Sequence, residues 1–246
     1  MNDLHNKRAL VTGGARGIGA AIALALAEGG ADVAITYGRS AERAAEVVEA
    51  IQGKGRRGVA IRADAADPAA VRRSVEEAVA ALGGLDILVN NAAIAAYATI
   101  AEVSPETIDE LFAVNVRGTI LAAQAAMPHL PAGGRIVTIG SGGADRIVGD
   151  TGTIYFMTKS ALQSFTRGLA RELGPRDITV NLVQPGSTDT DMNPADGPFA
   201  DFQRNLIPLG RYGAPQDVAA AVAFLASPAA RHVSGAILNV DGGQLT

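Results

Sequence analysis

The chain carries Thr12-Gly13-Gly14-Ala15-Arg16-Gly17-Ile18-Gly19 between a short apolar run and a long alanine-rich segment. Residues 8–11 before it are typical of a buried strand, and residues 20–27 after it are strong helix formers. A helix N-terminus has unpaired N–H groups and a partial positive charge, and it therefore binds anions. The stretch predicts a strand, an anion-binding turn and a helix.

The glycines explain how such a turn would approach a phosphate. Gly13, Gly17 and Gly19 have no Cβ, which permits unusual backbone angles and close contact with a ligand. Their spacing is G-x-x-x-G-x-G rather than the commoner G-x-G-x-x-G fingerprint. Because glycine-rich turns are common between elements, a tight turn without a ligand is the alternative at this point.

Composition favours one globular domain over residues 1–246. Hydrophobic residues make up 48% of the 246 residues, and no proline-rich linker, repeat or low-complexity block divides them. The net charge of −4 provides no basic surface for nucleic acid. No apolar run is long enough to span a membrane, and residues 1–7 lack the apolar core of a signal peptide, so we expect a cytoplasmic protein. The chain has no cysteine, which excludes disulfides and thiolate metal sites.

Apolar runs alternate with helical patterns along the rest of the chain. After the first strand, strands are predicted at 32–37, 58–62, 85–90, 135–139, 178–183 and 236–240. The helical patterns cover 40–52, 68–82, 105–128, 155–173 and 217–226, with Asp67-Pro68 and Ser104-Pro105 as helix starts. Alternating strands and helices indicate an α/β fold with a parallel sheet.

The second strand points to the identity of a bound dinucleotide. Folds that hold NAD often place an acidic residue at the end of this strand, where it binds the ribose 2′-OH. Here the strand is followed by Gly38-Arg39-Ser40 without an acid. Arg39, together with Arg16 in the glycine turn, would suit a 2′-phosphate, which favours NADP. The alternative is that both arginines are solvated surface residues.

Polar residues also follow the third and fourth strands. Asp64 is placed to accept a hydrogen bond from an adenine amino group, although a turn-forming aspartate is almost as plausible. Asn90-Asn91-Ala92 would allow close approach to a ribose, with a plain loop as the alternative.

The helix predicted at 155–173 carries the most informative pair. Tyr155 and Lys159 are four residues apart and project from one face. An ammonium beside a tyrosine lowers the pKa of the phenol, so Tyr155 would serve as a general acid or base. Taken alone, such a pair is more often a surface tyrosine packed on a lysine stem. Asn115, between two valines, needs a partner if it is buried, and a structural amide is the usual explanation.

Regular patterning fades over residues 189–210. Prolines interrupt this segment and several aspartates cluster in it. Long irregular segments in compact domains are often lids or binding segments, and we expect residues 187–210 to form a substrate loop.

The spaced features together resemble the classical short-chain dehydrogenase/reductase family over nearly the whole chain. The matching positions are the glycine turn, Asp64, Asn90-Asn91-Ala92, Asn115, Ser141, Tyr155-x-x-x-Lys159 and Pro185-Gly186, in the family's order. The resemblance implies a doubly wound Rossmann fold with one seven-stranded parallel sheet of order 3-2-1-4-5-6-7.

The resemblance also implies a role for each site residue. Tyr155 would give a proton to a carbonyl oxygen that Ser141 holds by a hydrogen bond. Lys159 would lower the pKa of Tyr155 and bind the nicotinamide ribose, while Asn115 would anchor a water connected to Lys159. Thr188 would contact the nicotinamide amide, and no metal is needed. The residues expected to contact NADP(H) are Gly13, Arg16, Gly17, Ile18, Gly19, Arg39, Ser40, Asp64, Ala65, Asn91, Ala92, Tyr155, Lys159, Pro185, Gly186 and Thr188.

Two positions depart from the family pattern. Ala93 stands where the family usually has glycine, and Ser141 is one position further from Tyr155 than usual, which predicts a longer intervening loop. The expected activity is NADPH-dependent reduction of a ketone or aldehyde, reversible to alcohol oxidation, with 3-oxoacyl thioesters as one substrate class. A homotetramer packing the helices that begin near residues 105 and 153 is the family expectation.

A regulatory protein on the same scaffold is the alternative. Residues 140–146 and 184–196 are similar to a family member that binds cyclic di-GMP in biofilm dispersal. Such a protein would bind a nucleotide and show little turnover.

Overall fold

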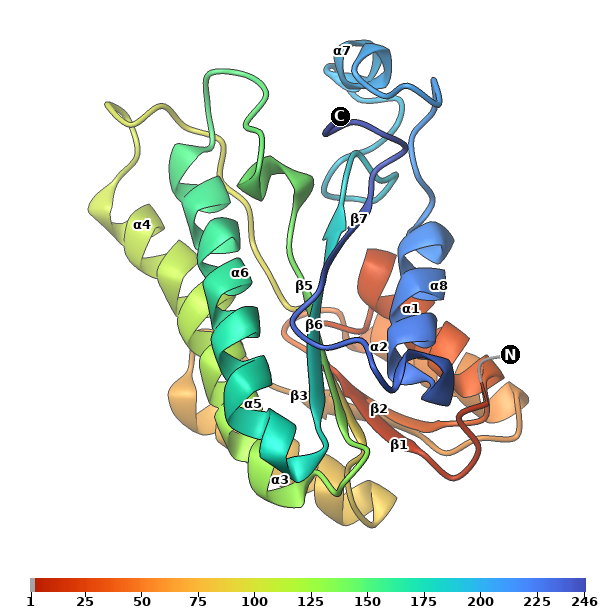
Figure 1. The fold of residues 1–246 in the computed structure, drawn as a ribbon. Helices are drawn as coiled ribbons and strands as arrows, with labels where there is room; N and C mark the ends of the chain where they lie inside the picture. Colours follow the sequence, from red (N-terminus) through yellow and green to blue (C-terminus); the bar gives the residue numbers. More distant parts are fainter. Residues whose placement is uncertain (1–2) are drawn as a thin grey trace.

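The computed structural model describes residues 3–246 (Figure 1). Met1 and Asn2, which begin the N-terminal segment considered above, lie outside the described residues. In the described part of the chain, no helix is both long and apolar enough to cross a membrane.

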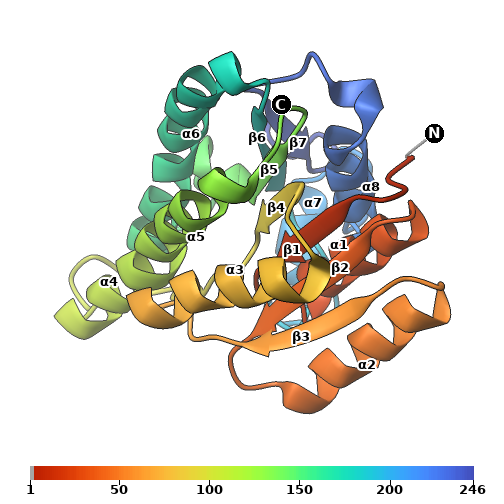
Figure 2. The same ribbon diagram turned by 90° about the horizontal axis from the view of Figure 1, so that it is seen from below.

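Seven strands form one parallel sheet of order β3-β2-β1-β4-β5-β6-β7, which confirms the predicted topology (Figures 1 and 2). Their bounds are β1 Arg8–Val11, β2 Asp32–Tyr37, β3 Gly58–Arg62, β4 Ile87–Asn90, β5 Arg135–Ile139, β6 Thr179–Pro185 and β7 Ile237–Val240. The order reverses between β1 and β4, and ligands of such sheets bind beyond the carboxyl ends of the strands at this point.

Helices cover both faces of the sheet. The α-helices are α1 Gly17–Glu28, α2 Ala41–Gly53, α3 Pro68–Leu82, α4 Pro105–Phe112, α5 Thr119–Ala126, α6 Thr153–Leu173, α7 Ala200–Asn205 and α8 Pro215–Ala226. Figure 1 shows α1, α2 and α8 on one face and α3, α4, α5 and α6 on the other. Side chains of a strand alternate between these faces: Val33 and Ile35 pack in one core cluster, and Ala34 packs in the other.

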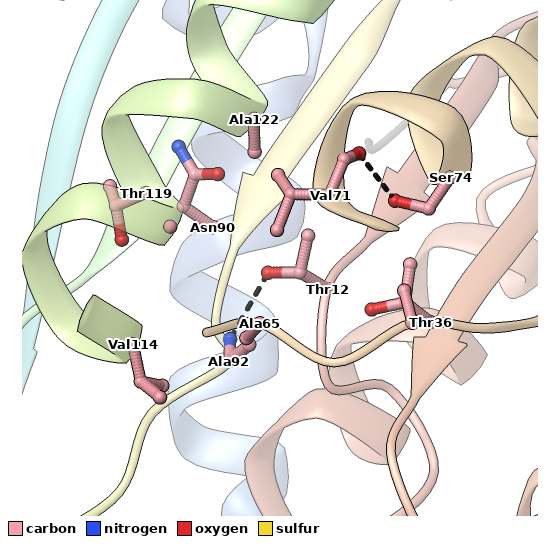
Figure 3. A pocket seen from close by; sticks show the side chains of 12 residues that line it. Thr12, Thr36, Ala65, Val71, Ser74, Asn90, Ala92, Val114, Thr119 and Ala122 are labelled. Carbon is pink, nitrogen blue, oxygen red and sulfur yellow. Dashed lines mark hydrogen bonds between the residues drawn. The ribbon is translucent and has the colours of Figure 1, made fainter. Parts of the chain in front are cut away.

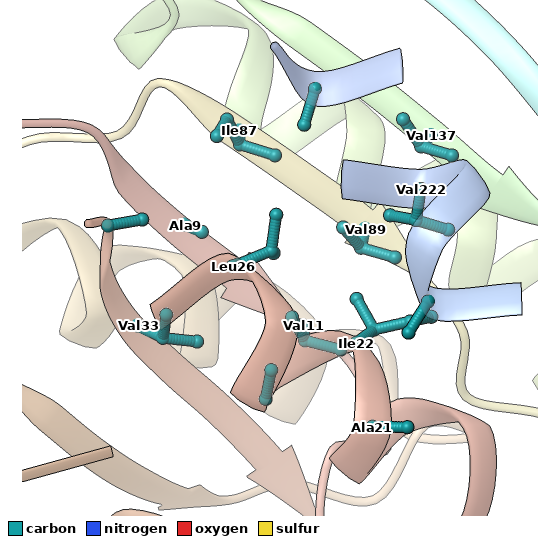
Figure 4. Close-up of a cluster of buried hydrophobic side chains, with 14 of the residues drawn as sticks. Ala9, Val11, Ala21, Ile22, Leu26, Val33, Ile87, Val89, Val137 and Val222 are labelled. Carbon is teal, nitrogen blue, oxygen red and sulfur yellow. The ribbon is translucent and has the colours of Figure 1, made fainter. Parts of the chain in front are cut away.

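The core is built from small aliphatic side chains. In the cluster beneath α1 and α8, Ile22 and Leu26 of α1 and Val222 of α8 pack on Val11 and Val89 of the strands (Figure 4). These residues are almost fully buried. Alanines on the facing helix surfaces allow close helix packing, so the chain fills this core without a tryptophan.

The helix predicted at 105–128 differs from the prediction in its centre. Residues Ala113–Gly118 form a π-helical turn between α4 and α5, and Met127–His129 form a final 3₁₀ turn. The wider turn contains Asn115, and a Cβ at Gly118 would lie 2.5 Å from the carbonyl oxygen of Ala65. The predicted start is confirmed, because Ser104 Oγ accepts a hydrogen bond from the Thr107 N–H.

The segment predicted to lack regular structure contains the short helix α7. Six residues are too few to produce a periodic pattern among the surrounding prolines. Reciprocal amide hydrogen bonds between Asn193 and Gln203, at 2.9 and 3.1 Å, tie α7 to the segment before it.

Candidate functional site

A large cleft of about 1470 Å³ opens beyond the carboxyl ends of the strands. The loops that follow β4 and β5 and the segment containing α7 rise above this edge in Figure 1. The predicted site residues that line the cleft are Gly13, Arg16, Gly17, Ile18, Gly19, Arg39, Ser40, Asp64, Ala65, Asn91, Ala92, Ser141, Tyr155, Lys159, Pro185, Gly186 and Thr188. Asn115 and Asn90 are the predicted site residues that the fold does not bring to this surface.

The glycine turn has the geometry of an anion cradle. Gly13 and Gly17 have φ values of 65° and 52°, in the left-handed region that favours glycine. A Cβ at Gly19 would lie 2.3 Å from the Gly13 carbonyl oxygen, so this glycine lets α1 begin directly against the turn. No side chain caps the N-terminus of α1, which leaves its first-turn N–H groups for a ligand phosphate.

Asn91 supports this turn from the neighbouring strand. Its side-chain amide donates to the carbonyl oxygens of Thr12 and Gly13 at 2.9 and 3.0 Å. Thr12 Oγ1 in turn accepts hydrogen bonds from the N–H groups of Asn91 and Ala92. The amide nitrogen of the Asn91 side chain therefore holds the turn, and Asn91 also lines the cleft, where it is predicted to contact the ligand.

A small cavity lies behind the turn, between α3, α5 and the ends of β1, β2 and β4 (Figure 3). The space open to the centre of a water molecule is about 20 Å³, which excludes any ligand larger than water. Asn90, which is 3% exposed, lines this cavity, and neither polar atom of its side chain has a hydrogen-bond partner in the described residues.

The two arginines predicted to select NADP lie at the same end of the cleft. Arg39 is exposed there. Arg16 Nη1 lies 3.4 Å from Asp191 Oδ2, and Arg43 of α2 contacts the same carboxylate. The contact joins the segment 187–210 to the glycine turn, and the sequence does not reveal it because the partners are far apart in the chain.

Asp64 forms the turn that was one of the two alternatives above, and its contact with an adenine stays a prediction. Its carboxylate accepts a hydrogen bond from the Ala66 N–H at 2.9 Å, which is an aspartate turn, and the residue also lines the cleft.

Ser141, Tyr155 and Lys159 converge in the middle of the cleft. Ser141 lies two residues after β5 and caps the 3₁₀ turn Gly142–Ala144, where its Oγ accepts a hydrogen bond from the Gly143 N–H at 3.3 Å. Tyr155 and Lys159, from α6, are 8% and 3% exposed. Lys159 Nζ lies 6.0 Å from the centre of the Tyr155 ring and donates to the Ile139 carbonyl oxygen at 3.0 Å.

Burial dominates the electrostatics of this group. It raises the pKa of Tyr155 well above its ordinary value, and the neighbouring Tyr97 adds to the increase, while a hydrogen bond with Ser141 opposes it. Burial also lowers the pKa of Lys159 to about 8. The pKa of Tyr155 thus moves in the direction opposite to the one expected from Lys159, because the burial of the phenol determines the direction of the shift.

Asn115 is withdrawn behind the cleft, and all its side-chain hydrogen-bonding groups are used. Its Oδ1 accepts from the Ile94 N–H at 2.9 Å, and its Nδ2 donates to the Ile94 carbonyl oxygen and to Thr158 Oγ1, both at 3.0 Å. The residue is 1% exposed. The π-helical turn carries this side chain inwards, where it joins the loop after β4 to α6.

Aromatic side chains surround Tyr155. The Tyr155 ring centre is 5.9 Å from that of Tyr97 and 5.1 Å from that of Phe156. Phe199 and Phe202, from the segment around α7, line the cleft and are 70% and 54% exposed. None of these aromatics was predicted, because scattered aromatics have no distinctive spacing.

The arrangement suits transfer of a proton from one hydroxyl to a substrate oxygen that a second hydroxyl holds by a hydrogen bond. Tyr155 and Ser141 are the donors, and Lys159 is the nearby cation. Within residues 3–246, no group of three or more histidine, cysteine or acidic side chains is placed to bind a metal ion.

Known proteins resemble the chain over almost its whole length. A family model described as enoyl-(acyl carrier protein) reductase matches residues 13–244. Versicolorin reductase of Emericella nidulans is 42% identical over 253 residues, which cover 98% of this chain and 96% of that protein. The cyclic-di-GMP-binding biofilm dispersal mediator protein of Escherichia coli is 41% identical over 242 residues, with 98% of each chain covered.

A solved structure extends the comparison to the fold. A short-chain dehydrogenase from Burkholderia cenocepacia, in complex with NADP, superposes with a TM-score of 0.98 and 55% identity, covering 99% of this chain and 100% of that one. Together with the sheet order and the convergent Ser141, Tyr155 and Lys159, these matches show that the chain belongs to the short-chain dehydrogenase/reductase family of oxidoreductases.

Proposed function

We propose that the chain is an NADPH-dependent carbonyl reductase that also oxidises the corresponding alcohol. The observation that carries this proposal is the convergence of Ser141, Tyr155 and Lys159 in one cleft with the glycine turn. The reductase names of the relatives support the reaction class.

The proposed reaction assigns one task to each of these side chains. Bound NADPH supplies the hydride to the carbonyl carbon. Ser141 Oγ–H donates a hydrogen bond to the carbonyl oxygen, and Tyr155 transfers its phenolic proton to that oxygen. The raised pKa of Tyr155 keeps its proton in place until the oxygen gains negative charge. Lys159, close to the ring, stabilises the tyrosinate that remains.

The cleft has groups that fit each part of NADPH. The glycine turn and the open N-terminus of α1 suit the pyrophosphate. Arg16 and Arg39 suit the 2′-phosphate, and Asp64 and Ala65 line the end of the cleft next to them. Pro185, Gly186 and Thr188 would hold the nicotinamide. The NADP complex of the Burkholderia relative supports this cofactor.

The aromatic lining favours a planar, largely apolar carbonyl substrate. Tyr97, Phe199 and Phe202 present exposed rings to the cleft, and stacking on such rings favours flat molecules. The similarity to versicolorin reductase supports an aromatic ketone. A 3-oxoacyl thioester is the other substrate class we propose, because the matching family model carries an acyl-carrier-protein reductase description.

We further propose that residues 1–246 form one domain with residues 187–210 as its substrate loop. We also propose a cytoplasmic homotetramer. Exposed Phe112, Ile120 and Met157 on α4, α5 and α6 support an interface on that side of the molecule.

A panel assay tests the proposal. Aromatic ketones, aldehydes and 3-oxoacyl thioesters are mixed with the purified protein and NADPH, and absorbance of the cofactor is followed at a wavelength specific to its reduced form. We expect turnover with some of these carbonyls and a preference for NADPH over NADH. Absence of turnover with the whole panel would count against a reductase.

The second candidate is a cyclic di-GMP-binding regulator. The 41% identity to the biofilm dispersal protein favours it over other binding functions. Titration of cyclic di-GMP against protein saturated with NADP separates the two: saturable binding at micromolar concentration without carbonyl turnover would support the regulator.

A further inference from the structure

A group of polar side chains joins the turn after Ser141 to three other elements. It consists of Asp145, Gln163 of α6, Gln184 of β6 and Asn239 of β7, and we call it the polar clamp. We propose that the polar clamp fixes Ser141 relative to Tyr155 and Lys159, which makes Asp145 a positioning residue for carbonyl reduction. This inference rests on the function proposed above.

Asp145 uses both carboxylate oxygens to join two elements. Its Oδ1 accepts from Gln163 Nε2 at 2.6 Å, and its Oδ2 accepts from Gln184 Nε2 at 2.7 Å. Hydrogen bonds to a charged acceptor are short and stronger than neutral ones. The carboxylate therefore holds α6 and β6 at a fixed separation.

Gln184 is the buried centre of the polar clamp and has no exposed surface. Its Nε2 also donates to Asn239 Oδ1 at 3.0 Å, and its Oε1 accepts from Gln163 Nε2 at 2.9 Å. A buried amide that loses a partner is costly, so this network allows one arrangement of the four side chains.

Each anchored element also carries part of the site. Gln163 lies four residues after Lys159, on the same face of α6. Gln184 directly precedes Pro185 and Gly186, which line the cleft. The polar clamp thus ties together the segments that present the tyrosine, the lysine and the proposed nicotinamide site.

A short 3₁₀ turn transmits this anchoring to Ser141. The Asp145 N–H donates to the Gly142 carbonyl oxygen at 3.1 Å, and the Ala144 N–H donates to the Ser141 carbonyl oxygen at 3.0 Å. Ser160 Oγ of α6 donates to the Ala144 carbonyl oxygen at 2.9 Å. Ser141 is one end of this hydrogen-bonded turn and Asp145 is the other.

The turn has little room to shift while the polar clamp is intact. A Cβ on Gly143 would lie 2.0 Å from the Phe156 ring, so the backbone lies directly against α6. Residues 145–147 beyond it are exposed. Arg146 Nη1 donates to the Thr246 carbonyl oxygen at 3.2 Å, so the carboxylate of Asp145 is the anchor of this end to α6 and β6. Release of this anchor would let the Ser141 hydroxyl move away from the carbonyl oxygen.

The test removes the carboxylate of Asp145 and then places a carboxylate on its hydrogen-bond partner, Gln184. In Asp145→Ala both glutamines lose their charged acceptor. We expect kcat to fall roughly tenfold to a hundredfold, since displacement of a reacting group by about 1 Å has effects of this size. The dissociation constant for NADPH, measured by fluorescence, should rise by a much smaller factor than kcat falls, because the glycine turn, Arg16 and Arg39 are untouched. Hydrogen–deuterium exchange of residues 141–146 should become faster.

The reciprocal exchange separates positioning from a general loss of structure. Asp145→Asn alone leaves one acceptor and should give an intermediate kcat. Asp145→Asn with Gln184→Glu exchanges the carboxylate and the amide between the two positions. A charged hydrogen bond can then form again, and kcat should return most of the way to the wild-type value. The control is Glu172→Ala on α6, whose side chain makes no hydrogen bond or ion pair in the described residues and should leave every readout unchanged.

Unchanged kcat and exchange in Asp145→Ala would overturn the proposal. So would a kcat loss accompanied by an equal loss of NADPH affinity, or no recovery in a folded double variant. If the wild-type protein reduces no carbonyl, the proposed function fails, but the exchange rates of residues 141–146 still test the polar clamp. If Asp145→Ala does not fold, Asp145→Asn and the double variant carry the same comparison.

Discussion

At the scale of single residues, burial sets the charge states of the cleft. Burial raises the pKa of Tyr155, which keeps the phenol protonated. Burial also lowers the pKa of Lys159 to about 8, close to neutral pH. The lysine amine donates to the Ile139 carbonyl oxygen, yet it has no carboxylate partner in the described residues. Burial of the Lys159 ammonium therefore lowers the unfolding free energy of the protein.

This penalty predicts a pH-dependent stability difference between the wild type and Lys159→Met. In the unfolded chain a lysine keeps its proton up to a pH of about 10.4. Between pH 8 and 10 the unfolded state therefore binds more protons than the folded state, and the stability of the wild type rises relative to the variant. We expect the advantage of Lys159→Met in unfolding free energy to shrink by about 2 kcal/mol from pH 7 to pH 10. Urea unfolding at both pH values measures it, and a pH-independent difference would show that this lysine is not the source.

Arg39 gives the second prediction at this scale. Arg39→Ala should weaken NADPH binding by roughly tenfold to a hundredfold, the usual value of a charge-assisted hydrogen bond to phosphate. Binding of NADH, which has no 2′-phosphate, should be almost unaffected. Arg72→Ala, an exposed arginine on α3, is the matched control. Equal losses of affinity for NADPH and NADH would mean that Arg39 does not bind the 2′-phosphate.

At the scale of elements, glycines in two helices should respond in opposite ways to a methyl group. In α1, a Cβ at Gly19 would lie 2.5 Å from Asn91 Nδ2 as well as close to the turn, whereas a Cβ at Gly168 in α6 meets nothing within 4 Å. Gly19→Ala should lower the unfolding free energy by about 1–3 kcal/mol and weaken NADPH binding. Gly168→Ala should raise it by about 0.5–1 kcal/mol through helix propensity, without changing turnover. Chemical denaturation of both variants measures these values, and stabilisation by Gly19→Ala would be inconsistent with the close approach of α1.

Elements with a strong periodic pattern were predictable from the sequence. The strands and their order follow from buried apolar runs such as residues 32–37 and from the family pattern, and the glycine turn identifies the cofactor end of the sheet. The π-helical turn at 113–118 could not be predicted, because the hydrophobic pattern does not distinguish one helical turn type from another. That turn is the reason why Asn115 lies behind the cleft.

Contacts between segments that are distant in the chain could not be predicted from the sequence either. The contact of Arg16 with Asp191 and the bonds of Asp145 to Gln184 depend on how loops fold over the sheet edge. Charged and amide residues in loops give no signal in a single sequence until the fold brings them together.

At the scale of the whole molecule, the proposed tetramer should depend on the apolar side chains of α4 and α5. Phe112 and Ile120 are 37% and 41% exposed. Ile120→Glu would place a charge in a packed interface and should dissociate the assembly. Light scattering during size exclusion measures the mass, with Leu209→Glu outside these helices as the control. A wild-type monomer, or a tetramer that tolerates Ile120→Glu, would contradict this interface.

The central claim is that the whole fold serves to present NADPH and a carbonyl group to Tyr155. The most direct test compares Tyr155→Phe with Tyr212→Phe, a buried tyrosine that does not line the cleft. Steady-state NADPH oxidation with the best ketone of the panel is measured alongside NADPH affinity. We expect Tyr155→Phe to lose at least about a hundredfold in kcat, in keeping with the loss of a general acid, while NADPH affinity and the Tyr212→Phe rate stay near the wild-type values. Turnover retained in Tyr155→Phe would contradict the account.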